Sequence, residues 1–227
     1  MRTAIVLLIV LLGCGSPAYA NIAATVDPDA LTWTNMADET ALGWRFFAEK
    51  EFTITHLGLF DYHDDGLGAT HTLGIWRVNK TGGLTLMRQA DIGPGTGTLL
   101  DHHLFVDIED FTIVPDPVPW IDPASGNSYY ERWVVGVWSP DENVDALILQ
   151  PRDAATILAE SEGFIRMESQ LSRTSSVFSY PWGNASDYDY FGVNFLYTPA
   201  QIPAPGALAL TAVGLALLCR RSRRSGS

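Results

Sequence analysis

The middle of the chain carries short segments in which apolar and polar positions alternate with period two. In Glu51–Asp61, "EFTITHLGLFD", every second residue falls on the same face, and the segment is rich in β-branched and aromatic residues. Asp64-Asp65-Gly66 then provides turn residues. This pattern predicts a β-strand that ends in a turn. Five further segments are predicted as strands on the same grounds: Thr70–Val78, Leu84–Ile92, His103–Ile108, Arg132–Trp138 and Tyr188–Tyr197.

Between these segments the chain is broken by turn residues, with 20 glycines and 13 prolines in the whole sequence. No long amphipathic helix is evident, and only Ala154–Glu162 has the pattern of one or two helical turns. Many short strands separated by turns are typical of an antiparallel β-sandwich or jelly roll. The sequence therefore predicts an all-β domain over residues 21–200.

The first 20 residues have the three parts of a secretory signal peptide. Arg2 supplies the positive charge, Ala4–Leu12 the apolar run, and Ala18-Tyr19-Ala20 the small-residue cleavage site. An alternative is a lipoprotein signal, because Leu11-Leu12-Gly13-Cys14 is similar to a lipobox in which Cys14 would be lipidated. Both alternatives predict that the protein is exported.

The last 27 residues, 201–227, form a linker and a second apolar segment. Gly206–Cys219 contains 14 apolar or small residues, fewer than the about 20 that an α-helix needs to cross a bilayer. The segment is preceded by Pro203-Ala204-Pro205. Four arginines follow it, which predicts that this end stays on the cytoplasmic side: Arg220, Arg221, Arg223 and Arg224.

This arrangement of a Pro-x-Pro motif, a short apolar helix and a terminal arginine cluster resembles a PEP-CTERM sorting signal. Ala204 stands where that family usually has glutamate. The resemblance implies a sorting protease of the exosortase type, a membrane contact through the tail, and cleavage near Pro203–Gly206. It also implies a bacterial protein of the cell envelope or extracellular matrix, anchored transiently or permanently by the C-terminal helix.

Residues 38–197 are similar to uncharacterised extracellular domains that occur with such tails. The resemblance implies a β-sandwich and a place on the cell surface, and it implies no activity. The matching segments are Ala41–Phe46, Ile54–Asp61, Asp65–His71, Leu73–Trp76 and Tyr190–Phe195.

Charge and cysteine content exclude several function classes for residues 21–200. Nine of the 14 basic residues and all 26 acidic residues lie there, which gives a formal net charge of −17. Such a surface repels nucleic acids and anionic lipids, which bind to clustered lysine and arginine. The two cysteines, Cys14 and Cys219, lie in the terminal apolar segments, so the domain has no disulfide and no thiol chemistry.

Asp61, Asp64 and Asp65 are the candidate metal ligands. Three carboxylates close together and a following glycine could bind Ca²⁺, although their spacing is not that of an EF-hand. The same residue types are also those of an ordinary turn between strands. His63 and His71 flank this loop and could complete a mixed site, whereas adjacent His102 and His103 in a strand would point to opposite faces.

No common catalytic motif is present, and Gly93–Thr98, "GPGTGT", is predicted to be a turn, since neither a lysine nor a helix follows it. Aromatic residues in proline-flanked loops are candidates for stacking on sugar rings. They are Trp120, Tyr129, Tyr130, Tyr180 and Trp182, with Trp120 and Trp182 foremost. Four other tryptophans are expected in the core: Trp44, Trp76, Trp133 and Trp138.

These observations predict a non-catalytic exported protein of the bacterial surface or extracellular matrix, sorted by its C-terminal segment and requiring no cofactor. The alternative is a carbohydrate-binding module for exopolysaccharide. A third hypothesis is a hydrolase whose site is not recognisable from the sequence. The hypotheses differ in whether the loop aromatics converge on one exposed groove.

Overall fold

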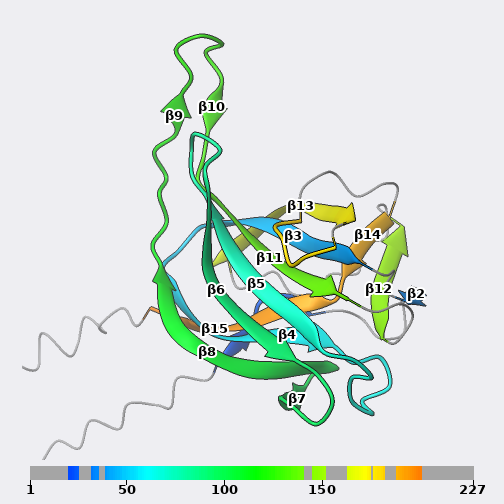
Figure 1. The fold of residues 1–227 in the computed structure, drawn as a ribbon. Coiled ribbons are helices and arrows are strands. Elements are labelled where there is room, and N and C mark those ends of the chain that lie inside the picture. Colours follow the sequence, from blue (N-terminus) through cyan, green and yellow to red (C-terminus); the bar gives the residue numbers. More distant parts are fainter. Residues whose placement is uncertain are drawn as a thin grey trace, which may run out of the picture.

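A computed structural model describes residues 20–25, 32–35, 39–140, 145–151, 163–174, 176–181 and 188–200. Within these ranges every regular element is a β-strand and all strand pairs are antiparallel (Figure 1), which confirms the predicted all-β class. The predicted signal peptide apart from Ala20, the helical segment Ala154–Glu162, Trp182 and the C-terminal tail lie outside the described residues. No helix in the described part is long and apolar enough to cross a membrane.

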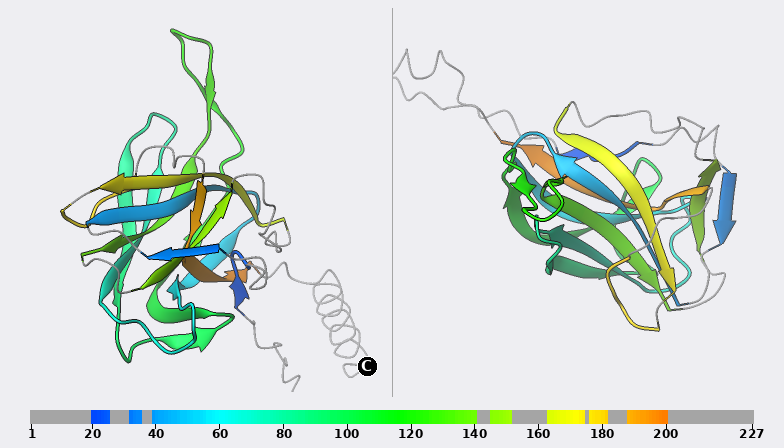
Figure 2. Two further views of the ribbon diagram at one scale, coloured as in Figure 1. Left: turned by 90° about the vertical axis from the view of Figure 1, so that its right-hand side faces the viewer. Right: turned by 90° about the horizontal axis from the view of Figure 1, so that it is seen from above.

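The strands form two curled five-stranded sheets, which are consistent with the predicted sandwich (Figure 2). In order across the first sheet, the strands are β1 (Asn21–Ile22), β15 (Val193–Pro199), β4 (Phe52–Phe60), β8 (His103–Ile113) and β7 (Thr98–Leu100). In the second sheet, they are β13 (Ile165–Thr174), β3 (Thr40–Ala48), β11 (Arg132–Ser139), β5 (His71–Val78) and β6 (Leu84–Ile92).

Two smaller groups of strands complete the fold. A three-stranded sheet has the order β14 (Tyr188–Phe191), β12 (Ala146–Pro151) and β2 (Thr32–Asn35). A two-stranded ribbon consists of β9 (Trp120–Ile121) and β10 (Ser128–Tyr129) and projects away from the two five-stranded sheets (Figures 1 and 2). We call residues 114–131, which form this ribbon and its stem, the arm.

The predicted strand boundaries hold for β4, β5, β6 and β11 to within one or two residues. The predicted strand Tyr188–Tyr197 is wrong as one element, because the chain leaves the three-stranded sheet at Phe191 and joins the first sheet at Val193. The predicted turn in Gly93–Thr98 is present, with positive φ at Gly95 and Gly97.

Aromatic side chains fill the core between the two large sheets. Trp44 stacks on Phe195 with ring centroids 5.6 Å apart, and Phe195 also faces Phe52 at 6.2 Å. The indole N–H of Trp44 donates to the carbonyl of Val193 at 2.8 Å, so burying the ring leaves no polar group unpaired. Trp44 joins the two sheets through this contact.

The other predicted core tryptophans lie in different surroundings. Trp133 is buried in the main core against Phe111, with ring centroids 6.1 Å apart. Trp76 is buried in a second cluster with Val134 and Leu171. Trp138 is half-buried, so the prediction that it belongs to the core is met only in part.

Three glycines lie side by side across the second sheet. Gly136 in β11 is in register with Gly43 in β3 and with Gly74 in β5. A Cβ on Gly136 would lie 2.9 Å from the ring of Pro181, and one on Gly74 would lie 2.6 Å from the ring of Phe178. Hydrogen atoms in place of side chains therefore let residues 178–181 pack directly on the sheet.

The N-terminal strand is held against the C-terminal strand. Asn21 pairs with Tyr197 and Ile22 with Leu196, so the first and last described segments run side by side in opposite directions. Asn194, which is 1 % exposed, hydrogen-bonds both backbone groups of Ala24. Residue 20 and residue 199 consequently lie at the same end of the domain.

Candidate functional site

The arm begins where β8 ends and has a proline-rich stem, "VPDPVP", over residues 114–119. Lys80 pairs with Asp116 of this stem, and Arg77 pairs with Glu131 at the other side of the stem, with Arg77 Nε 2.6 Å from the carboxylate. The hydrogen bond from Lys80 is the main cause that lowers the pKa of Asp116. Two ion pairs thus connect the stem to the end of β5 and the turn that follows it.

A tight loop closes the tip of the arm between Ile121 and Ser128. The Asp122 amide donates to the Asn127 carbonyl at 2.9 Å, and Gly126 adopts a positive φ of 73°. The Asp122 carboxylate accepts hydrogen bonds from the Ser125 hydroxyl at 2.5 Å and the Ala124 amide at 3.0 Å. The hydrogen bond from Ser125 is the main cause that lowers the pKa of Asp122.

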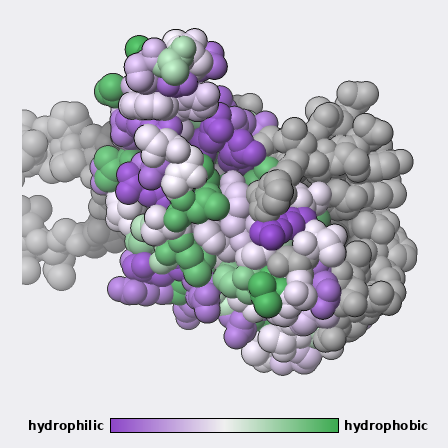
Figure 3. All heavy atoms as spheres, turned by 45° about the horizontal axis from the view of Figure 1, so that its top comes forward, coloured by the Kyte–Doolittle hydropathy of each residue, from purple (hydrophilic) through white to green (hydrophobic). Residues whose placement is uncertain are grey.

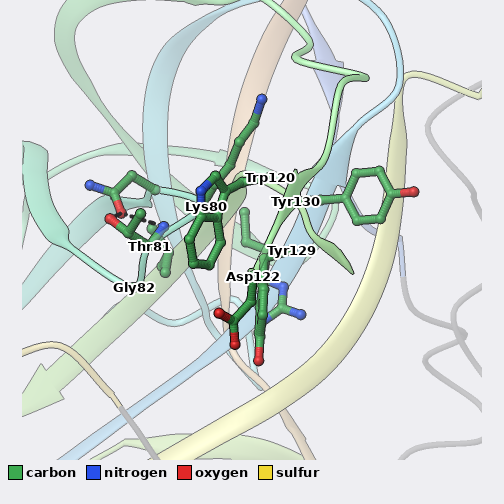
Figure 4. A pocket seen from close by; sticks show the side chains of 10 residues that line it. Lys80, Thr81, Gly82, Trp120, Asp122, Tyr129 and Tyr130 are labelled. Atoms are coloured by element: carbon green, nitrogen blue, oxygen red, sulfur yellow. Dashed lines mark hydrogen bonds between the residues drawn. The ribbon is translucent and has the colours of Figure 1, made fainter. Parts of the chain in front are cut away.

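A groove of about 390 Å³ lies between the arm and the turn that joins β5 to β6 (Figure 4). Its volume is within the usual range of small-molecule sites. The lining residues are Val78, Asn79, Lys80, Thr81, Gly82, Trp120, Asp122, Tyr129, Tyr130 and Arg132. The groove thus combines aromatic side chains with amide, hydroxyl, carboxylate and cationic groups.

The turn beneath the groove is held by one side chain. Asn79 Oδ1 accepts hydrogen bonds from the amides of Thr81 at 3.0 Å and Gly83 at 2.7 Å, and from the Thr81 hydroxyl at 2.9 Å. Gly82 takes a positive φ of 83°, which an L side chain rarely adopts. These bonds fix the shape of the turn that forms one wall of the groove.

Trp120 and Tyr129 form the aromatic wall. They are directly opposite each other in the β9–β10 register, and their ring centroids are 5.8 Å apart at an interplanar angle of 38°. Trp120 is 38 % exposed and Tyr129 36 % exposed. Single exposed apolar side chains are common on protein surfaces, but two exposed aromatic rings in contact form a continuous apolar patch, and such patches mark binding sites more often than isolated side chains do.

The other predicted stacking residues have different positions. Tyr130 also lines the groove, but its ring is directed to the other side of the strand in Figure 4 and meets Phe47 edge-on at 6.2 Å. Tyr180 does not line this groove: it is half-buried and packs against Trp76 beside the second cluster, where burial raises its pKa. Trp182 lies outside the described residues.

The acidic loop has the contacts of a turn. Asp61 is 4 % exposed and accepts a hydrogen bond from the Gly66 amide at 2.8 Å. Asp64, at a positive φ of 57°, pairs with the ring of His102 at 3.0 Å, and Asp65 is exposed. No group of three or more His, Cys, Asp or Glu side chains in the described part of the chain is arranged to hold a metal ion. The Ca²⁺ site stays a prediction.

The histidines near this loop pair with separate carboxylates. His71 Nε2 donates to Asp145 at 2.6 Å, and Asp145 also accepts the amides of Gly68 and Ala69. Burial opposes the ionised form of Asp145, but the hydrogen bond from His71 and the two amides lower its pKa overall. Asp145 therefore holds residues 68–71 through three contacts, and His71 does not join His63 in a shared site.

The sequence did not indicate which polar residues accompany the aromatics. Asn79, Lys80 and Asp122 were visible only as parts of turns, "NKTGG" and "DPASGN". Arg132 was visible only as the first residue of a strand. Their convergence depends on contacts between elements far apart in the chain.

The geometry defines an all-β protein with an aromatic groove on a projecting arm. A comparison with protein-family models, curated proteins and solved structures found no match to this chain. The function is therefore argued from the groove itself.

Proposed function

We propose that the protein binds carbohydrate in the groove between the arm and the β5–β6 turn. The observation that carries this proposal is the exposed Trp120–Tyr129 pair beside polar groups of both hydrogen-bonding types. The apolar face of a sugar ring can stack on an aromatic ring, while its hydroxyls can donate to Asp122 and accept from Lys80. Such a combination suits a polyhydroxylated ligand better than a purely apolar one.

The directions of the pKa shifts at Asp116 and Asp122 favour binding without hydrolysis. A glycoside hydrolase needs one carboxyl group that remains protonated to donate to the leaving oxygen. Hydrogen bonding lowers the pKa of Asp122 in the groove and of Asp116 in the stem, which is the opposite direction. The proposal is therefore a non-catalytic binding protein rather than a hydrolase.

The proposed setting is the bacterial cell envelope or extracellular matrix. In this proposal residues 1–20 direct export, residues 21–200 form the displayed domain, and residues 201–227 anchor it until a sorting protease of the exosortase type cuts the tail. Two observations support it. Strand β1 begins at Asn21, directly after the predicted cleavage site at Ala20, and its pairing with β15 brings the two ends of the domain together.

Retention on a glycan array, with the full-length chain purified in detergent, tests the proposal. We expect the wild type to bind polysaccharides. Trp120→Ala should make the binding free energy less favourable by about 1–3 kcal/mol, the typical cost of removing an aromatic side chain that stacks on a nucleic-acid base. Trp182→Ala is expected to add a similar loss if that residue also stacks. Leu99→Ala, an exposed apolar change on β7, is the matched control. Absence of binding in the wild type would contradict the proposal.

A further inference from the structure

A second depression lies on the other side of the arm's stem. It has a volume of about 180 Å³, and its lining includes Phe47, Glu49, Asp116, Tyr130, Trp133 and Arg166. Like the first groove, it combines aromatic rings with charged groups. Tyr130, which is 42 % exposed, lines both.

The register of the second sheet connects the two depressions. Val78 in β5 is opposite Arg132 in β11, and Phe47 in β3 is opposite Arg166 in β13. The Arg132 guanidinium lies 5.9 Å from the centre of the Phe47 ring, so the two pairs form one row across four strands. With strands about 4.8 Å apart, the row from Val78 to Arg166 spans about 14 Å.

The surface along this row carries little net charge. Lys80 pairs with Asp116, Arg132 with Glu168 at 3.2 Å, and Arg166 with Glu49 at 2.6 Å. The domain as a whole has nine basic and 26 acidic residues in 21–200. Apolar and hydrophilic residues are interleaved around the base of the arm (Figure 3), which suits a ligand with both apolar faces and hydroxyls.

We propose that the interior of a linear, uncharged polysaccharide lies across this row, with sugar rings in both depressions and over Tyr130. The inference rests on the proposed function and specifies its ligand class. A single terminal sugar would use only the groove at Trp120 and Tyr129, whereas a chain would gain the second depression as well. A polyanionic chain would be repelled by the acidic remainder of the domain.

Affinity as a function of ligand length tests this proposal. We would titrate the full-length chain in detergent with cello-oligosaccharides and manno-oligosaccharides of two to six units. Wild-type affinity is expected to rise about tenfold or more over the series, the gain from one further stacking contact. Phe47→Ala should lower the affinity for the hexasaccharide more than the affinity for the disaccharide, which lies over Trp120 and Tyr129, and should thereby remove this gain.

Three variants and an acidic oligosaccharide distinguish failure of the chain inference from failure of the proposed function. Arg166→Ala repeats the test without removing an aromatic side chain, and Leu99→Ala is the control, with melting curves to verify folding. Equal wild-type affinity at all lengths, with binding still lost in Trp120→Ala, overturns the chain inference and leaves the proposed function. No binding of any probe overturns both. Tighter binding of oligogalacturonates overturns the choice of an uncharged ligand.

Discussion

Asn194 binds Ala24 through both ends of its side-chain amide. Its Oδ1 accepts the Ala24 N–H at 3.2 Å and its Nδ2 donates to the Ala24 carbonyl at 2.6 Å, 170 residues away in sequence. Oδ1 also accepts the amide of Phe195 at 2.9 Å. This side chain therefore adds to the β1–β15 pairing and to the Ala23 N–H to Phe195 carbonyl bond, which together hold the N-terminal segment beside β15.

Asn194→Ala should loosen that segment. The change leaves buried backbone groups of Ala24 and Phe195 without partners, and each such loss costs about 1–3 kcal/mol. We expect faster hydrogen exchange at residues 21–24 and a lower free energy of unfolding, measured by denaturant titration. Exchange in β5 should rise only as far as the lower free energy of unfolding requires, and exchange at residues 21–24 equal to that of the wild type would contradict this role.

The buried His103 predicts an acid-dependent loss of stability. Burial lowers its pKa from 6.5 to about 4, and its Nδ1–H donates to the Asp101 carbonyl at 2.7 Å. Because the unfolded chain takes up the proton first, stability falls as the pH drops from about 6.5 to about 4 and this contribution levels off below. The loss should be about 3 kcal/mol at most, at 1.36 kcal/mol per pKa unit.

Denaturant unfolding of wild type and His103→Gln at pH 7, 5 and 4 measures this effect. The difference between the two proteins should narrow as the pH falls. Asp145, whose pKa is lowered, contributes stability that is lost only at pH values below its ordinary 3.8, so it does not enter this window. A difference that is constant across the three pH values would refute the assignment to His103.

Gly136→Ala should destabilise the second sheet. The new Cβ would lie 2.9 Å from the Pro181 ring and 3.1 Å from the Leu42 carbonyl oxygen, so residues 178–181 must move. Overpacking of this kind costs about 1–3 kcal/mol. A fall in the melting temperature and a more exposed Trp76, read by tryptophan fluorescence, are expected. An unchanged melting curve would mean that the covering segment adapts without cost.

Melting curves with Ca²⁺ and with a chelator test the acidic loop. An ion bound only to the folded protein would raise the melting temperature. Because Asp61 already accepts the Gly66 amide and Asp64 pairs with His102, we expect the two curves to coincide. A higher melting temperature with Ca²⁺ would instead support the site that the sequence predicts at Asp61, Asp64 and Asp65.

The intact mass of protein from its native cells tests the proposed tail processing. Cleavage near Pro203–Gly206 should give a mature chain that ends close to Ala204 and lacks the apolar segment. A mass that still includes Arg220–Ser227 would leave an ordinary membrane anchor. Replacement of Arg220, Arg221, Arg223 and Arg224 by serine should release an unprocessed precursor, because the arginines would no longer stop translocation.

Local patterns explain which parts of the fold the sequence predicted. Strand β4 has a strong period-two pattern and is bounded by a turn, so its position was visible. The break between β14 and β15 was not visible in the sequence, because the segments on either side of Gly192 both have the pattern of a strand. The hydrogen-bond partner of His71 is Asp145, which lies 74 residues away in sequence, and no local pattern indicates such a contact.

The groove was predictable only in its aromatic members. Trp120 and Tyr129 can be recognised as aromatic residues in loops, but the contact between their rings depends on the register of β9 and β10, which have two residues each. Of their polar neighbours, Asn79 and Lys80 come from the β5–β6 turn, which approaches the arm through the Lys80–Asp116 pair, whereas Asp122 and Arg132 come from the arm tip and β11. The residue types therefore indicated that aromatic stacking was possible, whereas the tertiary contacts determine which residues line the same groove.

The prolines of the stem have a consequence for self-association. Pro115, Pro117 and Pro119 are two residues apart, so in an extended chain the amide positions that they occupy face the same edge. Proline has no N–H, and that edge consequently lacks donors at three successive positions. A second molecule cannot extend a hydrogen-bonded sheet along it. The arm can thus expose Val114, Val118 and Ile121 to water without offering that edge as a template for fibre growth.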